Sequence, residues 1–380
     1  MSTDRVLAAV RKAADDPRTG EVLWRVRADD GSVDATFGDP TRPFFLASAT
    51  KLYTVAILCQ LRAEGRVDWD APVAPLVPLL DLSGLSVASG RDRSAEMTVR
   101  EVMAHTAGLA DYFEGPRPDG PSTFERLLAE DAAWTPADAI AWTRPMKPGT
   151  PGVGLYSDSG FQILGALIEA VDQSSFADSV RRRITEPLGL SGTYVFGGAD
   201  ISRYGEVATM LHGESALRIP LAMSSVQADG GIVSTLDDGL MFLIAFFDGR
   251  LFPAPLLDEL MTDWHPVFFP LEYGTGIMRF RVRWYFSPLR RIPPFVGHSG
   301  ASGVVMFRCP DLGMTVVGTV NQVSRRSLPY QLMVRSALAA GRSEAQTAEV
   351  SATETAIVEE TAASAAPEAA GVEIPASVPV

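Results

Sequence analysis

The sequence predicts an α+β protein in which strands from both chain ends form one antiparallel β-sheet, flanked by helices and interrupted by a large helical insertion. Three observations support this prediction: a hairpin pattern near the N-terminus, a second group of β-patterned segments beyond residue 274, and a middle rich in helix-start signals. An apolar fraction of 46% is sufficient to bury a core. We expect one folded body over residues 1–340, with a helical subdomain at about 66–270, and a separate tail over 341–380.

Alternating apolar and polar residues mark the strands. Residues 21–27 and 32–37 alternate on either side of Asp30-Gly31, a dipeptide typical of tight hairpin turns. Near the C-terminus, three further segments are β-rich, and apolar residues at helical spacing predict a final helix over 328–340. These three segments are 275–285, 303–308 and 314–320.

Capping residues predict where the middle helices begin. Ser, Thr, Asp and Asn at a helix start accept hydrogen bonds from the free N–H groups of the first turn. Thr98 with Glu101 forms a capping box, and Thr135 is followed by Pro136 at the first helical position. The predicted N-caps are Thr98, Thr135, Thr235 and, ahead of the apolar run over 161–171, Asp158 or Ser159.

Charge and composition exclude several classes of partner. With 33 basic and 46 acidic side chains the formal net charge is −13, which disfavours nucleic acid because its phosphates would be repelled. The N-terminus lacks the apolar core of a signal peptide, and the longest strongly apolar stretch, 240–247, is too short to span a bilayer. Cys59 and Cys309 fit neither a metal-binding spacing nor a disulfide framework. We therefore expect a cytoplasmic protein with reduced thiols, no metal, and no nucleic-acid or membrane partner.

The C-terminal segment differs in composition from the rest of the chain. Residues 341–380 contain seven glutamates, one basic residue, eleven alanines and no aromatic residue, which gives a net charge of −6. A segment of this composition has little apolar surface to bury. We expect a disordered, solubilising acidic tail, with a partner-docking motif as the alternative.

A serine and a lysine three residues apart form the first motif that points to chemistry. Ser48 and Lys51 lie at the start of an apolar segment with helical spacing that ends at Gly65. On a helix this spacing places both side chains on one face, so the amine can reach the hydroxyl, and the helix dipole favours negative charge near Ser48. This arrangement can activate a serine nucleophile without a histidine. The alternative is an N-capping serine followed by a solvated lysine.

A second cluster leads through several glycines to a tyrosine. Residues 148–160 place Tyr156 beside small polar residues and Asp158 at the entrance of an apolar helix. If the phenol lies near Lys51, the positive charge favours the phenolate as a proton acceptor. The alternative is a half-buried aromatic residue followed by an N-capping aspartate.

A third cluster surrounds a histidine with glycines. Residues 297–303 read Gly-His-Ser-Gly-Ala-Ser-Gly and are followed by a β-patterned segment. Glycines in such a position permit close approach of a ligand to the backbone. Of the four histidines, only His298 lies in such a frame, although a structural or surface role is the alternative for an isolated histidine.

Together and in this order, the three clusters resemble the serine β-lactamase-like superfamily, which includes class C β-lactamases, DD-peptidases, and related esterases and D-aminopeptidases. Three other segments are similar to family motifs: 102–109 to His-Thr-Ser-Gly-Leu, 186–193 to the Pro-Leu-Gly-Met turn, and 229–235 to Gly-Gly-Leu-x-Ser-Thr. The resemblance covers roughly residues 20–340. It implies a sheet domain packed against a helical domain, with the active site between them.

The resemblance also implies a role for each motif residue. Ser48 is expected to be the acylated nucleophile, Lys51 its activating partner, and Tyr156 the companion base. The backbone N–H groups of Ser48 and Ala301 are expected to form the oxyanion hole.

Two motifs depart from the family pattern. The second motif is usually Tyr-Ser-Asn or Tyr-Ala-Asn, but here Asp158 takes the place of the asparagine. The third is Lys-Thr-Gly or Lys-Ser-Gly in β-lactamases and DD-peptidases, but here it is His298-Ser299-Gly300, as in several esterase and aminopeptidase relatives. The resemblance implies that these four residues bind substrate and that His105, in a supporting segment, is structural.

The predicted function is a serine hydrolase that cleaves a small ester, with an amide as the alternative, through an acyl-enzyme and without a metal or organic cofactor. A D-aminopeptidase or a weak β-lactamase is the alternative among enzymes. The alternative of another class is a catalytically silent homologue that binds a ligand or partner. Tyr112, Phe113, Phe268 and Phe269 could line an apolar acyl pocket or act as packing anchors.

Overall fold

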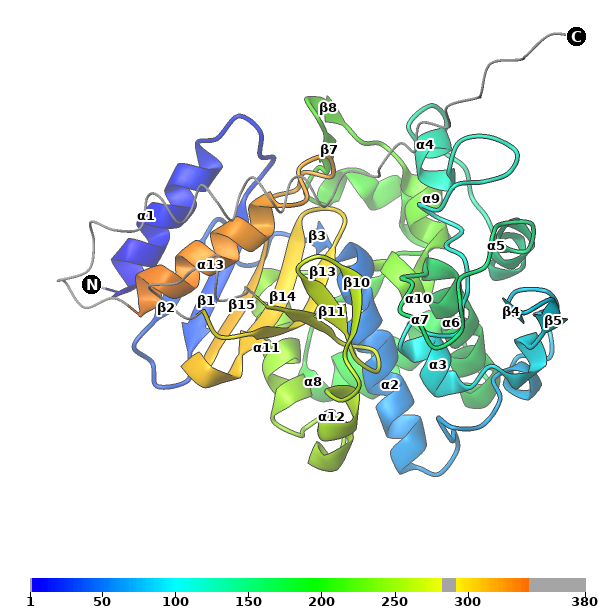
Figure 1. Cartoon of the computed structure of the whole chain (residues 1–380). Coiled ribbons are helices and arrows are strands. Elements are labelled where there is room, and N and C mark those ends of the chain that lie inside the picture. The colour runs from blue at the N-terminus through cyan, green and yellow to red at the C-terminus, as the bar shows by residue number, and fades with distance from the viewer. Residues whose placement is uncertain (1, 282–291, 342–380) are drawn as a thin grey trace, which may run out of the picture.

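The computed structural model describes residues 2–281 and 292–341. Its main feature is an eight-stranded antiparallel sheet in the order β10-β11-β12-β13-β14-β15-β1-β2 (Figure 1). The strands are β1 (Leu23–Ala28), β2 (Asp34–Phe37), β10 (His265–Phe268), β11 (Leu271–Tyr273), β12 (Met278–Phe280), β13 (Phe295–Gly300), β14 (Val304–Cys309) and β15 (Met314–Thr319). Strands from both ends of the chain share one sheet, which confirms the predicted fold class.

The two chain ends meet where β1 pairs with β15, and Val26 lies opposite Val316 in that pair. The predicted N-terminal hairpin is present, and Gly31 in its turn has a φ of 72°, a conformation that glycine adopts without a steric penalty. The predicted segment 303–308 overlaps β14, which extends one residue further, and the predicted segment 314–320 contains β15. Within 275–285 the structure forms a strand at 278–280, and residues 282–291 lie outside the described residues.

Helices cover the sheet and fill the insertion between β2 and β10. They are α1 (Ser2–Ala14), α2 (Lys51–Ala63), α3 (Val99–Met103), α4 (Thr123–Leu127), α5 (Pro136–Thr143), α6 (Asp158–Asp172), α7 (Phe176–Val180), α8 (Glu186–Leu188), α9 (Pro220–Ser225), α10 (Gln227–Gly230), α11 (Leu236–Phe247), α12 (Ala254–Leu260) and α13 (Leu328–Ala340). The predicted caps Thr98, Thr135 and Thr235 each accept a hydrogen bond from the backbone of the third helical residue, which confirms these helix starts. At α6, Ser157 occupies the N-cap position and Asp158 is already helical.

Side chains alternate between the two faces of the sheet, and different helices cover each face. On one face, Val305 and Phe307 belong to a cluster that includes residues of α1 and α13. On the other face, Val304 and Met306 join the larger core with residues of α2 and α11. Figure 1 shows α1 and α13 lying side by side, so the first and last helices cover the same face.

Two features of the fold differ from the prediction. The first is α1, which the sequence pattern does not indicate because only Val6 and Val10 along it are buried. Through this narrow apolar stripe α1 packs on α13 and β2. α11 and β10 fall within residues 66–270, yet both belong to the sheet layer. The middle of the chain therefore contributes to both layers.

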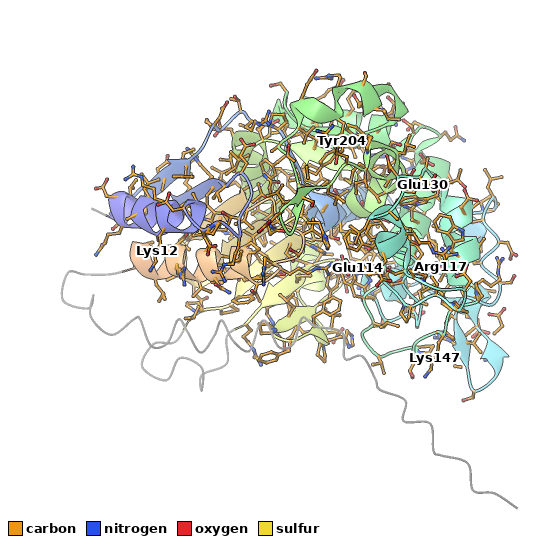
Figure 2. All side chains as sticks on the ribbon, turned by 90° about the horizontal axis from the view of Figure 1, so that it is seen from above. Lys12, Glu114, Arg117, Glu130, Lys147 and Tyr204 are labelled. Atoms are coloured by element: carbon orange, nitrogen blue, oxygen red, sulfur yellow. The ribbon has the colours of Figure 1, made fainter. Side chains whose placement is uncertain are left out.

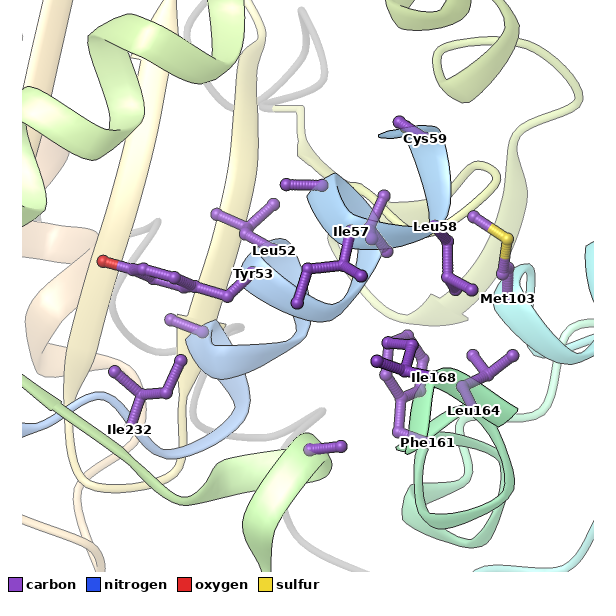
Figure 3. Close-up of a cluster of buried hydrophobic side chains, with 14 of the residues drawn as sticks. Leu52, Tyr53, Ile57, Leu58, Cys59, Met103, Phe161, Leu164, Ile168 and Ile232 are labelled. Carbon is purple, nitrogen blue, oxygen red and sulfur yellow. The ribbon is translucent and has the colours of Figure 1, made fainter. Parts of the chain in front are cut away.

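α2 is buried on all sides and joins the sheet layer to the helical layer. Every residue from Lys51 to Cys59 is buried. Figure 3 shows Leu58 directed toward Met103 of α3 and Leu164 of α6. A helix that is apolar around its circumference is typical of a core element. The start of α2, which carries the Ser-x-x-Lys motif, is therefore held between the two layers.

Candidate active site

Ser48 lies in a short 3₁₀ turn, Ala47–Thr50, directly before α2. The sequence predicts a continuous helix here, whereas the first turn is tighter and has three residues per turn, so side chains at Ser48 and Lys51 project in the same direction. Ala47 has a φ of 45°, in the left-handed region. Hydrogen bonds at both ends of the turn join it to Ile232 of β9 (Ile232–Ser234). Ser48 remains partly exposed at this position.

Lys51 is fully buried at the start of α2. Its Nζ donates hydrogen bonds of 2.6 Å to Asp158 Oδ1 and of 2.6 Å to the backbone oxygen of Asp229. The ring centroids of Tyr156 and Phe161 each lie 5.2 Å from Nζ. Burial disfavours the ammonium, but the charges of Asp158 and Asp229 outweigh it and raise the pKa of Lys51 above its usual value. Lys51 is therefore an ammonium in the resting protein.

Two carboxyl groups, those of Asp158 and Asp229, act on this ammonium, and a third, that of Asp111, lies next to Asp158. Asp158 is the direct ion-pair partner of Lys51, and its residue is only 7% exposed. Burial raises the pKa of Asp158, although Lys51 acts in the opposite direction. Asp111 accepts a hydrogen bond of 3.1 Å from the backbone N–H of Asp158, and burial together with the Asp158 charge raises the pKa of Asp111 to about 8. Because one ammonium faces several carboxyl groups, the cluster retains protons that an isolated ion pair would release.

Asp229 is fixed by a buried hydrogen-bond network. Its Oδ2 accepts bonds of 2.9 Å from Tyr112 OH and 3.0 Å from Gln162 Nε2. Burial and the nearby Asp158 charge raise the pKa of Asp229 well above its usual range. Tyr112 is fully buried, so of the two predicted roles it has that of a packing anchor.

Tyr156 reaches the cluster from the glycine-rich loop that precedes α6. The Ser48 side chain lies close enough to the phenol to act on its pKa, which it lowers. Burial and the Asp158 charge raise the pKa of Tyr156 well above its usual value. From the charge of Lys51 alone, the sequence predicts a lowered pKa for Tyr156. This prediction is wrong because Asp158 balances that charge. The phenol beside Ser48 is therefore neutral.

The third motif forms the end of β13 and the turn into β14. A side chain at Gly300 would place its Cβ 2.3 Å from the backbone oxygen of Leu46 and 3.0 Å from Ala47 Cβ, so glycine allows β13 to lie against the Ser48 turn. Ser48 follows Ala47 in the turn, and Ala301 follows Gly300 at the end of β13, so both residues lie next to this contact. Among the residues that the structure describes, their backbone N–H groups donate no hydrogen bond.

His298 is directed into the interior and has no exposed surface. Its Nδ1 lies 2.7 Å from the backbone oxygen of Ser299, and its Nε2 lies 2.9 Å from Tyr273 OH. Because a carbonyl only accepts, Nδ1 carries the proton and Tyr273 donates to Nε2. Burial and the charge of Lys51 lower the pKa of His298 to about 3, which leaves the ring neutral. Contact between His298 and a substrate remains a prediction, since the ring has no exposed surface and both of its nitrogens are already hydrogen-bonded.

The remaining aromatic residues divide between the site and a separate cluster. Phe268 is 50% exposed, and its ring centroid lies 5.6 Å from that of Tyr156. Phe269 is also exposed. Phe113 instead packs near Trp134, at 6.2 Å between ring centroids. Phe268 therefore contacts the site directly, through the Tyr156 ring.

An ion pair joins the two sides of the site. Glu114, from the loop after α3, pairs with Arg326, which precedes α13. Both charges act on the pKa of Asp158, so the pair lies close to the carboxyl cluster. Figure 2 shows Glu114 between the part of the molecule that carries the C-terminal helix and the part that carries the middle helices.

Sequence reasoning did not assign roles to several residues of the site. They are Asp111, Gln162, Asp229 and Tyr273. The available signal was weak: Asp229 opens the segment similar to Gly-Gly-Leu-x-Ser-Thr, but its side chain is not a family motif residue. The contacts of the other three arise only when distant segments pack together.

Comparison with known proteins agrees with this architecture. The Beta-lactamase family model matches residues 9–339. A D-stereospecific amidohydrolase from Streptomyces superposes with a TM-score of 0.67 at 25% identity, covering 85% of this chain and 95% of that one. The chain is 30% identical over 160 residues to ML-236A carboxylate methylbutanoyltransferase from Penicillium citrinum, or 39% of this chain and 36% of that protein. It is 28% identical over 200 residues to Esterase EstB from Burkholderia gladioli, or 49% of this chain and 46% of that protein.

The fold and the match to the family model define the class of protein. The chain belongs to the Beta-lactamase family. Its matches span less than half the length of those two curated relatives, at 36% and 46%. In residues 2–281 and 292–341, no helix has the length and apolarity needed to cross a membrane, and no group of three His, Cys, Asp or Glu side chains is placed to hold a metal ion.

Proposed function

We propose that the protein is a serine hydrolase that cleaves a small ester through an acyl-enzyme on Ser48. The proposal rests on one observation above all: a partly exposed Ser48, in the turn that leads into the buried Lys51, lies close enough to the Tyr156 phenol to act on its pKa. The unused N–H groups of Ser48 and Ala301 support an oxyanion hole at the contact between β13 and this turn. Relatives described as an esterase and an acyltransferase support acyl chemistry at this fold.

Attack by Ser48 needs a proton acceptor, and both neighbouring groups are protonated at rest. The hydrogen bond between Lys51 and Asp158 is 2.6 Å long, so transfer of one proton along it yields a neutral amine and a carboxylic acid without a change in net charge. The amine then accepts the proton of Ser48, directly or through Tyr156, while Ser48 Oγ bonds to the acyl carbon. In this proposal Asp158 holds the proton that Lys51 must give up.

The two half-reactions use the same groups in sequence. When the bond between the acyl carbon and the alcohol oxygen breaks, the proton taken from Ser48 passes to the leaving oxygen. A water then attacks the acyl-enzyme and gives one proton to the amine, and its hydroxyl remains on the acyl carbon. Ser48 Oγ leaves and recovers that proton, and the free acid departs.

We infer that neutral short-chain esters are better substrates than anionic β-lactams. The family's third-motif lysine would attract a carboxylate, whereas His298 is neutral and buried, and Ser299 Oγ is already hydrogen-bonded to Tyr330 OH. The charge of Asp158 is balanced by Lys51, so repulsion from Asp158 is weaker than the sequence alone suggests. The loss of a permanent cation at the third motif is therefore the main reason for the preference.

A substrate panel tests this proposal. We expect kcat/KM for p-nitrophenyl acetate and butyrate to exceed that for a chromogenic cephalosporin by at least roughly five-fold, the effect of about 1 kcal/mol. Ser48→Ala is the control and is expected to be inactive. Efficient cephalosporin turnover by the wild type would contradict the charge argument.

Two alternatives predict different results in the same panel. Faster turnover of D-amino acid amides than of esters would favour a D-aminopeptidase, an activity class related to that of the D-stereospecific amidohydrolase. A catalytically silent binder would hydrolyse none of the substrates and would not react with a serine-directed phosphonate.

A further inference from the structure

We propose that His105 is a positioning residue for Tyr156, an inference that rests on the proposed function. Sequence reasoning assigned His105 only a general structural role. The contacts of this residue are instead concentrated on the two neighbours of Tyr156 in the chain and on the Tyr156 ring itself.

The segment that begins at His105 holds the glycine-rich loop that carries Tyr156. Three backbone hydrogen bonds join the segment to the loop. They run from Gly149 N–H to Gly108 O at 3.0 Å, from Gly152 N–H to Thr106 O at 2.8 Å, and from Leu155 N–H to His105 O at 2.8 Å. The loop is thereby fixed at three points before it reaches Tyr156.

A fourth hydrogen bond uses the imidazole. The backbone N–H of Ser157 donates to His105 Nδ1 at 3.1 Å. Tyr156 therefore lies between two amides, those of Leu155 and Ser157, that are both bound to His105. His105 has a φ of 58°, and in this conformation both its backbone oxygen and its imidazole are hydrogen-bonded to the same loop.

The imidazole ring also contacts Tyr156 directly. The two ring centroids lie 4.3 Å apart, and those of Tyr273 and Phe161 lie 4.4 Å and 5.4 Å from His105. The His105 residue is 3% exposed, so this packing leaves the ring little freedom. The phenol orientation toward Ser48 is thus constrained from one side by His105.

The Ser157 bond also fixes the tautomer of His105. Because Nδ1 accepts from an amide, the neutral ring carries its proton on Nε2. Nε2 is buried without a hydrogen-bond partner in the part of the chain that the structure describes. Burial and the charge of Lys51 lower the pKa of His105 well below its usual value, so the acceptor at Nδ1 stays available. The Ser157 amide is therefore the polar contact that orients this ring.

Two substitutions separate the contributions of the ring and the acceptor. His105→Asn removes the aromatic ring but retains a side-chain oxygen that can accept from Ser157, and asparagine tolerates a positive φ. His105→Phe retains a ring but removes the acceptor. For ester hydrolysis by the full chain we expect each change to lower kcat by roughly 10-fold to 100-fold, with KM changed less than three-fold, because misplacing a catalytic group by about 1 Å has effects of this size. His212→Asn is the matched control and is expected to behave as wild type.

A double-mutant cycle with Tyr156→Phe tests whether His105 acts through Tyr156. We expect His105→Asn to have less than a two-fold effect on kcat when Tyr156 is already phenylalanine, because the group it positions is gone. Equal fold-losses in both backgrounds would overturn the inference and indicate a general structural effect. Should His105→Asn fail to fold, the same cycle with His105→Phe decides.

The outcomes also separate this inference from the proposed function. If Tyr156→Phe retains wild-type activity, the proposed role of Tyr156 is wrong and the inference about His105 is wrong with it. If Tyr156→Phe is strongly impaired while both His105 variants retain wild-type kcat, the proposed function stands and only the positioning role is wrong.

Discussion

At the scale of single residues, the site is organised around one buried ammonium. A buried charge without a partner costs several kcal/mol, so Lys51 depends on Asp158 and on the backbone oxygen of Asp229. The same carboxylate balances the charge that would otherwise draw a proton from Tyr156. Asp158 therefore controls the protonation of both groups that contact or approach Ser48.

Replacing Asp158 by asparagine should move the pH profile of activity. The Asp158 charge raises the pKa of Lys51 and of Tyr156, so both pKa values fall in Asp158→Asn. Asparagine cannot hold the proton that Lys51 gives up, so in the variant only Lys51 that is already neutral can accept the proton of Ser48. We therefore expect kcat/KM at pH 7 to fall and the acidic limb of the pH profile to move to higher pH, where it follows the Lys51 amine instead of the Asp158 carboxylate. Asp237 is exposed, so Asp237→Asn is the control and should leave the acidic limb of the pH profile unchanged. A limb unchanged in Asp158→Asn would show that neither group governs it.

The buried histidines should make stability depend on pH. The pKa of His298 is about 3 in the folded protein, so between that value and about 6.5 the unfolded chain binds a proton that the folded chain does not. The stability that the neutral His298 contributes is therefore fully present above pH 6.5. As the pH falls from 6.5 toward 3, this part of the free energy of unfolding decreases by about 1.4 kcal/mol per pH unit.

Comparison with His298→Gln isolates this contribution from that of the buried carboxyl groups, whose raised pKa values act in the opposite direction. Urea unfolding at pH 7 and pH 5 measures it. We expect the stability advantage of the wild type over the variant to be smaller at pH 5. An equal advantage at both values would mean that His298 is protonated in the folded protein.

At the scale of elements, the contact between β13 and the Ser48 turn brings the motifs together. Gly300→Ala would force a Cβ to 2.3 Å from the backbone oxygen of Leu46, so strand and turn must separate. We expect activity to fall at least roughly ten-fold and stability by about 1–3 kcal/mol, the usual effect of overpacking. Gly198→Ala is the control, since its added Cβ meets nothing within 4 Å. Normal activity in Gly300→Ala would show that the contact does not determine the site.

The sequence predicts elements better than it predicts their polar contacts. Capping residues and alternating patterns are local, and they correctly mark the hairpin, the starts of three helices and the last helix. The ion pair of Lys51 with Asp158 joins residues 107 positions apart, and its existence depends on how α2 and α6 pack. The pKa direction of Tyr156 was therefore predicted wrongly, because it depends on a partner that local patterns do not show.

At the scale of the whole molecule, the first and last helices close one face of the sheet. α1 packs on α13, and Trp24 Nε1 of β1 donates a hydrogen bond of 3.1 Å to Ser336 Oγ of α13. Both ends of the folded body are therefore tied to the sheet. Residues 342–380, which the structure does not describe, follow directly after Gly341.

Deletion of residues 341–380 should leave the activity and stability of the folded body nearly unchanged. The segment has a net charge of −6 and no aromatic residue, so it has little apolar surface to contribute to the core. We expect kcat/KM and the melting temperature of the shortened chain to match those of the full chain. A large loss of kcat or a fall of several degrees in melting temperature would show that the tail packs on the body.

The central claim is that Ser48 forms the acyl-enzyme, and intact-protein mass spectrometry tests it most directly. After reaction with a serine-directed phosphonate, the wild type should gain the mass of one phosphonyl group, and peptide mapping should place it on Ser48. Ser48→Ala, with an unchanged melting temperature, should gain none and should not hydrolyse p-nitrophenyl butyrate. Equal labelling or equal turnover in Ser48→Ala would contradict the account.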